Sequence, residues 1–318
     1  MRRVVVSAIT AAALLTSVAA CGADDEAGGA EGTTKVKVGA IPIVDVAPLH
    51  LGVSKGFFAE EGIEVEVVNT TGGAAAVPGV VSGEFDFAFG NVVSLIVARS
   101  QNIPLRAIAE GNSSTGEQGG DFGGVVVPAD SPITGPAELA GKTVAVNNLK
   151  NIGDTTVRAS IRKAGGDPSG VQFVELPFPD MPAAVSGKRV DAAWIVEPFF
   201  TVAQDQGARV IASNFVDTAP DLTVAAYFTT ERTIQEKGDL TRRFTAAIEK
   251  SLTYAQEHPD EARAALLTYA QIDPAVAEKI TLPGWSGQIN RESVQTMADL
   301  MLADGLISQQ VDIAELLP

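Results

Sequence analysis

The sequence predicts an α/β fold made of two similar lobes, and three observations lead to this prediction. Short apolar, β-branched segments alternate with helical segments from Lys35 onward, a rhythm typical of sheets whose faces are covered by helices. This rhythm restarts after residue 124. The chain from Lys35 onward is also longer than a usual single domain. We therefore expect two parallel-stranded sheets joined by two chain crossings, near 123–126 and 222–226.

The first residues have the pattern of a bacterial lipoprotein signal peptide. Arg2 and Arg3 precede an apolar segment at 4–18, and the VAAC sequence at 18–21 resembles a lipobox. Cys21 is the only cysteine of the chain, so no intrachain disulfide can form, and we assign it as the lipid attachment site. Residues 1–21 are thus predicted to export the protein and anchor it to the outer face of the cytoplasmic membrane, in the periplasm or at the cell surface.

Residues 22–34 are predicted to be a flexible tether. The segment GADDEAGGAEGTT is acidic, rich in glycine and free of large apolar side chains, so it cannot bury enough surface to fold. No segment after Cys21 is long and apolar enough to span a bilayer.

The first part of lobe 1 is expected at 35–124. Val36 and Val38 alternate with lysines, which indicates a strand, and the loop that follows holds an isolated Asp45. The turn at 70–73 (TTGG) is expected to open the second helix. Pro78 weakens this helix, because a proline inside a helix removes a backbone hydrogen bond, and a later start is the alternative. The expected strands are 35–38, 63–67, 85–89 and 105–109, and the expected helices are 49–59, a segment ending at Val81, and 92–100.

Lobe 2, expected at 125–223, contains the most informative segment, TVAVNNLKNIGDTTVRASIRKAGG at 143–166. A buried strand at 143–146 ends in an Asn-rich loop, and Asp154 is expected to cap the helix that follows. Such a loop presents free backbone N–H groups at the carboxyl edge of a sheet, where open α/β sheets bind ligands. The other expected strands are 125–127, 171–176, 190–195 and 209–212, and the other expected helices are 136–140, 182–186 and 199–206.

The two halves share a limited internal similarity. Residues 82–86 (SGEFD) and 186–191 (SGKRVD) each lead through a helix to a strand, at 107–109 (AIA) and 210–212 (VIA). This predicts two related lobes, each with a helix end, near Asn91 or Glu197, that faces a shared cleft.

From residue 224 the chain is expected to return to lobe 1. A strand at 223–228 precedes a mostly helical tail, with an amphipathic stripe over 240–255 and further helices at 260–270, 273–280 and 291–303. Apolar stripes at this spacing are typical of packing. The tail at 224–318 is therefore predicted to cover lobe 1.

Composition and motifs argue against several classes of function. The net charge of −16 and the pI near 4.5 argue against a nucleic-acid partner, which requires a basic face. The two histidines, His50 and His258, lie far apart and no His/Cys cluster exists, so no metal site is expected. Neither G-x-S-x-G nor G-x-x-x-x-G-K-[ST] occurs, and no carboxylate pair has a spacing that singles out acid–base chemistry. We expect no catalytic residue, no cofactor and no enzyme activity.

Four segments resemble the substrate-binding proteins of ABC importers, in particular the NMT1/THI5-like group with its sulfonate-, taurine-, nitrate- and thiamine-pyrimidine-binding members. These segments are KVKVGAIPIVDVAPLHLGVSKGFFAEEGIEVEVV, GEFDFAFGN, GPAELAGKTVAVNNLKNIGDTTVRASIRKAGGDP and GKRVDAAWIVEPF. The resemblance covers 35–318. It implies a periplasmic-binding-protein type II fold, in which two α/β lobes joined by two hinge crossings close on a solute. It also implies an ABC permease and its ATPase as partners, and we expect a monomer.

The resemblance implies that strand-end loops supply the ligand contacts. In lobe 1 the implied contacts are Asp45, the backbone of Gly72 and Gly73, and Asn91. In lobe 2 they are Asn148, Asp154, Phe178, Asp180, Trp194 and Glu197. Asp45 and Asp154 have an alternative role as helix caps, and Phe178 and Trp194 have one as core residues.

The same loops suggest the kind of solute. They hold one basic residue, Lys150, beside four carboxylates, which would repel a strong anion. Aromatic rings, carboxylates and amides suit a neutral or amine-bearing heteroaromatic ring. We therefore expect a thiamine-pyrimidine-like or other nitrogen-bearing nutrient.

Three alternatives stay open. Sulfonate, taurine or nitrate is one, because backbone N–H groups at helix starts also bind anions. A THI5-like pyrimidine synthase is another, although those enzymes carry a cysteine-rich motif and this chain has no cysteine after Cys21. A ligand-sensing lipoprotein is the third.

Overall fold

The computed structural model describes residues 33–318. The predicted signal peptide, the lipid attachment at Cys21 and nearly all of the predicted tether lie outside the described residues. Strand β1 begins at Thr34, so the last residue assigned to the tether belongs to the folded part.

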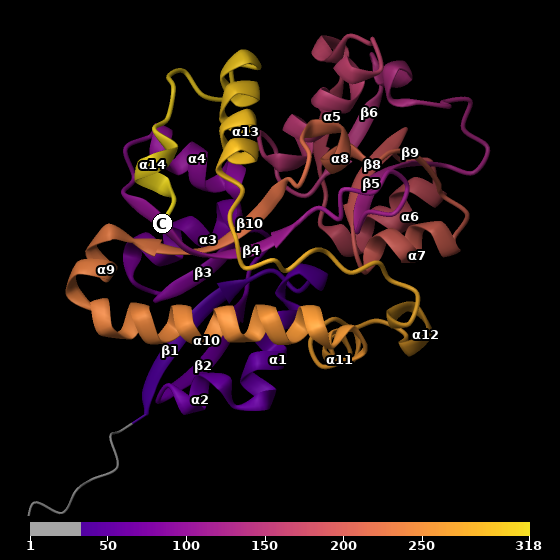
Figure 1. Ribbon diagram of the computed structural model, residues 1–318. Coiled ribbons are helices and arrows are strands. Elements are labelled where there is room, and N and C mark those ends of the chain that lie inside the picture. The colour runs from indigo at the N-terminus through magenta and orange to yellow at the C-terminus, as the bar shows by residue number, and fades with distance from the viewer. Residues whose placement is uncertain (1–32) are drawn as a thin grey trace, which may run out of the picture. The chain divides into compact units, whose positions relative to one another are not determined.

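Two five-stranded sheets organise this part of the chain (Figure 1). We call sheet A with the helices packed on it lobe 1, and sheet B with its helices lobe 2. Sheet A has the order β2-β1-β3-β10-β4, with β1 (Thr34–Ala40), β2 (Ile63–Asn69), β3 (Phe87–Asn91), β4 (Leu105–Ser113) and β10 (Thr223–Thr230). Sheet B has the order β7-β6-β8-β5-β9, with β5 (Gly123–Val127), β6 (Thr143–Val146), β7 (Gln172–Glu175), β8 (Ala192–Val196) and β9 (Arg209–Ala212).

The two sheets have the same arrangement, which confirms the prediction of two similar α/β lobes. Both are mixed rather than parallel, however, because β10 in sheet A and β5 in sheet B run antiparallel to their neighbours. Each of these two strands enters its sheet from the other lobe, and so runs against the strands that belong to the local strand–helix repeat. These inner strands are buried along their whole length, whereas edge strand β2 has one buried residue, Ile63.

The chain crosses between the sheets slightly earlier than the sequence suggested. The segments at 123–126 and 223–226 pair within β5 and β10, because their apolar side chains fill the two sheet interiors. The connections are therefore 114–122 and 213–222. Asp121 orders the first connection by accepting hydrogen bonds from the Ser114 hydroxyl at 2.6 Å and the Thr115 N–H at 3.1 Å.

The internal similarity has a structural counterpart in two aspartates. Asp86 accepts from the backbone N–H of Lys37 in β1 at 3.0 Å, and Asp191 accepts from that of Thr143 in β6 at 2.8 Å. The backbone N–H groups of both aspartates donate to the carbonyl oxygens of the same two residues. Equivalent side chains thus fasten equivalent strands in the two lobes.

Helices cover both lobes. Lobe 1 carries α1 (Ala47–Lys55), α2 (Phe57–Glu60), α3 (Gly73–Ser82), α4 (Val92–Ser100), α9 (Glu231–Glu236), α10 (Gly238–Glu257), α11 (Pro259–Leu266), α13 (Arg291–Ala303) and α14 (Ile313–Leu316). Lobe 2 carries α5 (Ile152–Lys163), α6 (Met181–Ser186), α7 (Phe199–Asp205) and α8 (Asn214–Thr218), and α12 (Pro274–Ala277) lies in the segment after α11. Short 3-10 helices occur at Val44–Val46, Pro136–Leu139, Pro168–Gly170 and Phe178–Asp180.

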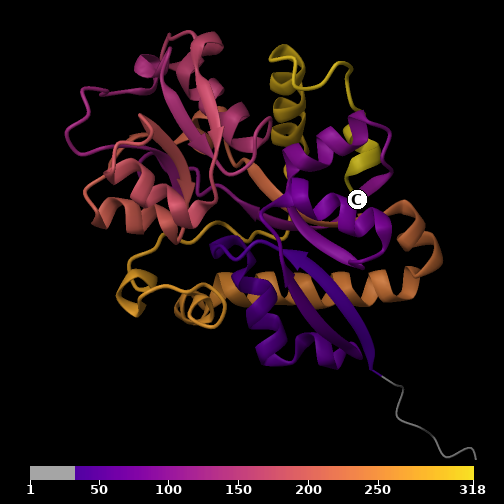
Figure 2. The same cartoon turned by 180° about the vertical axis from the view of Figure 1, so that it is seen from behind.

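The helical tail covers lobe 1 as predicted. In both views α10 runs along α1 and α2 (Figures 1 and 2). Helices α13 and α14 pack on α4, and α13 also contacts α5 of lobe 2. The tail therefore touches both lobes.

Of two predicted helix starts, the start of α3 at the 70–73 turn is confirmed, and the start of α5 at Asp154 was wrong. Helix α3 begins at Gly73 and contains Pro78, because its buried face, with Ala76, Val77 and Val80, packs on sheet A and offsets the one lost hydrogen bond. Helix α5 is capped by Asn151 rather than Asp154.

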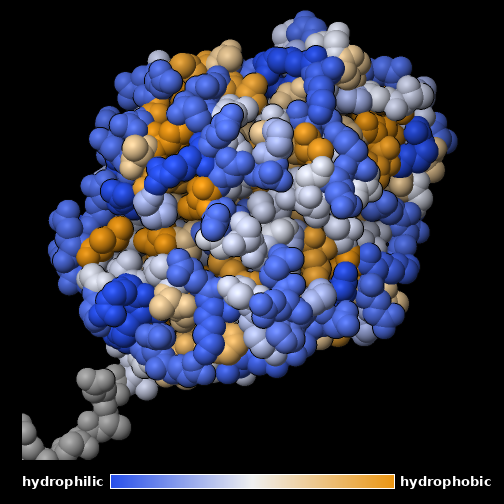
Figure 3. Space-filling model, viewed as in Figure 1, coloured by the Kyte–Doolittle hydropathy of each residue, from blue (hydrophilic) through white to orange (hydrophobic). Residues whose placement is uncertain are grey.

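On the face shown in Figure 3, apolar residues are scattered among polar ones. Within 33–318, no helix combines the length and the apolar character that a membrane crossing requires.

Candidate functional site

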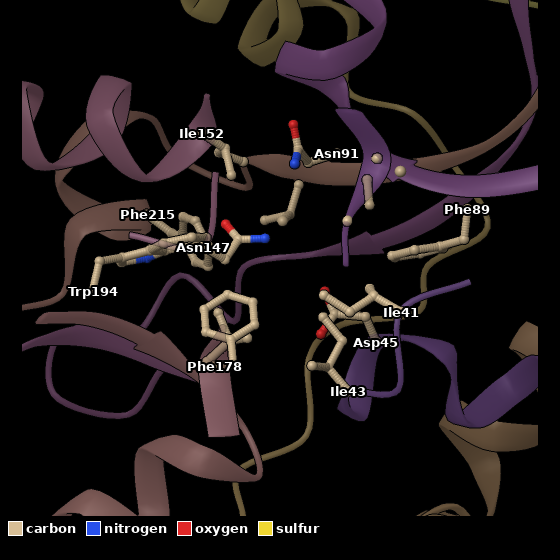
Figure 4. Close-up of a pocket in the computed structure, with 16 residues that line it drawn as sticks. Ile41, Ile43, Asp45, Phe89, Asn91, Asn147, Ile152, Phe178, Trp194 and Phe215 are labelled. Atoms are coloured by element: carbon tan, nitrogen blue, oxygen red, sulfur yellow. The ribbon is translucent and has the colours of Figure 1, made fainter. Parts of the chain in front are cut away.

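One cavity lies where the lobes meet, and the empty space among its lining residues, including the part that opens to solvent, is about 370 Å³ (Figure 4). Lobe 1 supplies the loop after β1, the start of α3, the end of β3 and part of β10. Lobe 2 supplies the end of β6, the start of α5, the segment after β7, and parts of β8 and α8. The lining residues are Ile41, Ile43, Asp45, Gly72, Gly73, Phe89, Gly90, Asn91, Asn147, Ile152, Phe178, Trp194, Val196, Phe215, Val224 and Ala225.

Aromatic rings form much of the lobe 2 wall. Trp194 lies edge-on to Phe178, with ring centroids 5.4 Å apart, and edge-on to Phe215 at 5.9 Å. Phe89 faces them from lobe 1 (Figure 4). Walls of this kind suit a flat, largely apolar ring.

Three buried polar atoms of the lining residues have no hydrogen-bond partner in the described part of the chain. They are Asp45 Oδ2, Asn147 Oδ1 and Trp194 Nε1. Buried polar groups are nearly always hydrogen-bonded, and an unpaired one costs about 1–3 kcal/mol. The first two atoms are acceptors and the third is a donor, so a molecule that offers both N–H groups and an acceptor would satisfy them.

Asp45 is the one ionisable side chain among the lining residues. It lies in the 3-10 helix Val44–Val46 and is 3% exposed. Asn112 Nδ2 donates to its Oδ1 at 3.1 Å. Burial raises the pKa of Asp45 from 3.8 to about 7; its hydrogen bonds oppose this rise, and the charge of Asp121 adds to it. No lysine or arginine lines the cavity, so the protein provides no cation for this carboxyl there.

Two glycines allow the start of α3 to approach both β3 and lobe 2. Gly72 has a φ of +148°, and a Cβ there would lie 2.4 Å from Asn148 Oδ1. A Cβ on Gly73 would lie 2.9 Å from the Cα of Gly90. These contacts leave no room for a larger residue at either position.

Hydrogen bonds cross directly between the lobes beside the cavity. Asn147 Nδ2 donates to the Thr71 carbonyl at 3.3 Å, and Asn151 Nδ2 donates to Ser94 Oγ at 3.0 Å. Ser94 Oγ in turn donates to Asn91 Oδ1, which also caps α4 by accepting from the Ser94 N–H. The structure is therefore a closed arrangement of the two lobes.

Six of the ten residues predicted to bind the ligand line this cavity, and they come from both lobes. They are Asp45, Gly72, Gly73, Asn91, Phe178 and Trp194. Asn148 and Asp154 are not among the lining residues. Asn148 Oδ1 lies 2.4 Å from the position of a Cβ on Gly72, and Asp154 accepts from the Lys150 N–H at 2.9 Å. Asp180 is exposed and does not line the cavity. Lys150 is exposed too.

Glu197 lies outside the cavity and fastens three segments together. It is 1% exposed. Its carboxylate accepts from the Thr201 hydroxyl at 2.7 Å, the Thr201 N–H at 3.0 Å and the Thr281 N–H at 3.3 Å. Its backbone carbonyl accepts from Val44 N–H, in the loop that carries Asp45. Burial raises the pKa of Glu197 from 4.5 to about 7.

Several wall residues were absent from the predicted set. Asn147 directly follows β6, in the same Asn-rich loop as the predicted Asn148. Phe215 lies within the second connection and has no local signal, because only the packing of α8 brings it to Trp194. Asn112 likewise reaches Asp45 only through the pairing of β4 with β10. Within 33–318, no cluster of three His, Cys, Asp or Glu side chains could hold a metal ion.

Comparisons with known proteins agree with this architecture. The family described as NMT1/THI5 like matches residues 43–262. A formylaminopyrimidine-binding protein of Halalkalibacterium halodurans is 26% identical over 69% of this chain, and the match covers 65% of that protein's own length. A putative aliphatic sulfonates-binding protein of Bacillus subtilis is 24% identical over 86% of this chain and 80% of its own length.

Among solved structures, the alkanesulfonate-binding protein SsuA from Xanthomonas axonopodis pv. citri bound to MOPS has a TM-score of 0.74. The two are 17% identical, and the match covers 91% of this chain and 99% of that one. The fold is that of the periplasmic binding proteins: two α/β lobes around a central cavity. The chain belongs to the NMT1/THI5-like family.

Proposed function

We propose that this chain is the solute-binding component of an ABC importer. It captures a small nitrogen-bearing aromatic nutrient, of the thiamine-pyrimidine type, and delivers it to a membrane permease driven by its ATPase. The cavity between the lobes is the observation that supports this most: it has aromatic walls, unpaired acceptors and a donor, and no cation.

Capture depends on closure of the two lobes. Asp45 belongs to lobe 1, whereas Asn147 and Trp194 belong to lobe 2, so only a closed cleft lets one molecule reach all three groups. A solute that interacts with both lobes shifts the population toward the closed form. The closed lobes then offer the permease a joint surface.

A sulfonate or nitrate is the second candidate. Gly72 and Gly73 at the start of α3 line the cavity, and free N–H groups at a helix start favour an anion. The unpaired carboxyl of Asp45 and the absence of a cation in the wall favour the nitrogen-bearing ring over an anion.

Calorimetric titration decides between them. The panel contains an aminopyrimidine, taurine, methanesulfonate and nitrate, each tested with wild type and with Phe178→Ala. We expect binding of the aminopyrimidine, weakened about tenfold or more in the variant. Binding of a sulfonate alone, with no response to heterocycles, would establish the second candidate.

We also propose that the protein is an exported, monomeric lipoprotein without enzyme activity, on the strength of its N-terminal sequence and its lack of catalytic motifs. We expect Cys21→Ala to abolish incorporation of labelled fatty acid and to release the protein from membranes. A variant that stays in the membrane fraction would contradict the anchor.

A further inference from the structure

The carboxyl of Asp45 lies at the edge of a group of unpaired polar atoms. Asp45 Oδ2, Asn112 Oδ1 and the Tyr227 hydroxyl are all buried without a hydrogen-bond partner within 33–318. Asn112 donates to the other oxygen of Asp45. Of these three residues, Asp45 is the one whose side chain lines the cavity.

The sheet register explains why these side chains gather. Asn112 of β4 lies opposite Ala225 of β10, and Tyr227 follows two residues later in the same strand. Side chains two residues apart share a face of a strand, so Tyr227 lies on the same face of β10 as Ala225, which lines the cavity and pairs with Asn112. Asp45 covers this position from the loop after β1.

This group offers mainly hydrogen-bond acceptors. Asp45 Oδ2, when ionised, and Asn112 Oδ1 only accept hydrogen bonds, whereas the Tyr227 hydroxyl can donate or accept. An amino group would place an N–H against the carboxylate and form a charge-assisted hydrogen bond, the stronger kind. An oxo group at the same place would bring an oxygen lone pair against a lone pair of the carboxylate, and the two acceptors would repel each other.

We propose that Asp45 is the residue that selects solutes with an amino group, and that Asn112 is a positioning residue that holds the carboxyl toward the cavity. This inference rests on the proposed function, since it assigns a specificity to the same cavity. The selected class is the amino-substituted heteroaromatic ring, in preference to the corresponding oxo-substituted ring.

The test compares two probes, 4-aminopyrimidine and pyrimidin-4-one, by calorimetry at about pH 8.5, where the carboxyl is ionised. Wild type is expected to favour the amino compound about tenfold or more. Asp45→Asn places an amide N–H₂ where an acceptor stood, and should remove or reverse this preference. Asp180→Asn makes the same chemical change at an exposed site outside the cavity, and should retain it.

Asn112→Ala is the second variant and keeps Asp45 in place. It should reduce the ratio of the two affinities about threefold or more, because the carboxyl loses its fixed orientation. Thermal unfolding of each variant shows whether it is folded. Equal affinities of wild type for both probes, or an unchanged ratio in folded Asp45→Asn, would overturn the inference while leaving the proposed function intact. Failure of wild type to bind either probe, together with sulfonate binding, would refute the nitrogen-bearing solute of the proposed function and establish the second candidate.

Discussion

Asn151 of lobe 2 donates a hydrogen bond to the Ser94 hydroxyl of lobe 1 over 3.0 Å, beside the cavity. Asn151 caps α5 and Ser94 lies in the first turn of α4, so this bond joins two helix starts across the cleft. One residue lies in a lobe 1 helix and the other caps a lobe 2 helix. Their contact therefore reports closure directly.

Ser94→Ala should weaken solute binding because the closed form loses a bond that the open form lacks. A hydrogen bond contributes about 0.5–1.5 kcal/mol, which corresponds to roughly a two- to tenfold rise in Kd. Ser100→Ala on the same helix is the matched control, since the Ser100 hydroxyl bonds only to the Val97 carbonyl of its own helix. Equal affinities of the two variants would show that the Ser94 bond has no part in closure.

Gly73→Ala should impair both folding and binding. The new Cβ would lie 2.9 Å from the Cα of Gly90, so α3 must move away from the edge of β3 that lines the cavity. We expect a drop in Tm and a rise in Kd of about tenfold or more. Gly135→Ala serves as the control, because no atom lies within 4 Å of its added Cβ. A Gly73→Ala variant that binds like wild type would place the solute elsewhere.

Glu197→Ala should destabilise the empty protein. The substitution leaves two buried donors from Thr201 and a partly buried one from Thr281 without their acceptor, and we expect a loss of about 2–4 kcal/mol in the free energy of unfolding. Denaturant titration measures it, with the exposed Glu84→Ala as the control. An unchanged stability combined with lost binding would instead make Glu197 a ligand contact, as the sequence suggested.

The stability of the empty protein should fall as pH rises from about 5 to about 8. Burial raises the pKa of Asp45 and of Glu197 to about 7. Between the ordinary and the raised values the folded state holds protons that the unfolded state has lost, so the free energy of unfolding decreases with pH and levels off above the raised values.

The share of Asp45 in this pH dependence can be isolated. Asp45→Asn should make the change in Tm between the two pH values smaller. The groups that act on Asp45 from other elements are Asn112, Asp121, Tyr227 and Tyr269. Neither tyrosine is ionised in this pH range, since burial raises the pKa of each above its ordinary value of 10.0. A Tm that rises with pH in wild type would contradict this assignment.

Local patterns in the sequence were sufficient for much of the fold. Strands β6 and β9 and helices α4 and α13 have the predicted bounds, because their apolar periods and caps are properties of neighbouring residues. The loops around Asp45, Gly72 and Asn91 were placed at the cleft for a similar reason, since strand ends in such sheets meet at one edge.

Tertiary contacts account for what the sequence did not show. Trp194 and Glu197 lie close together in the sequence, at the end of the same strand. Nevertheless, Trp194 lines the cavity, whereas the Glu197 carboxylate accepts a hydrogen bond from the Thr281 N–H. Asn112 meets Asp45 over a separation of 67 residues. The sheets are mixed because β5 and β10 insert antiparallel to their neighbours. The hydrophobic periodicity of a segment does not reveal the direction in which its strand pairs.

A crystal structure of the protein with 4-aminopyrimidine bound tests the central claim most directly. We expect the ring between Phe178 and Phe89, with its amino nitrogen within hydrogen-bond distance of Asp45 Oδ2 and the Asn151–Ser94 contact in place. A ring bound outside this cavity, or a cavity that stays empty at saturating ligand while the lobes remain closed, would contradict it.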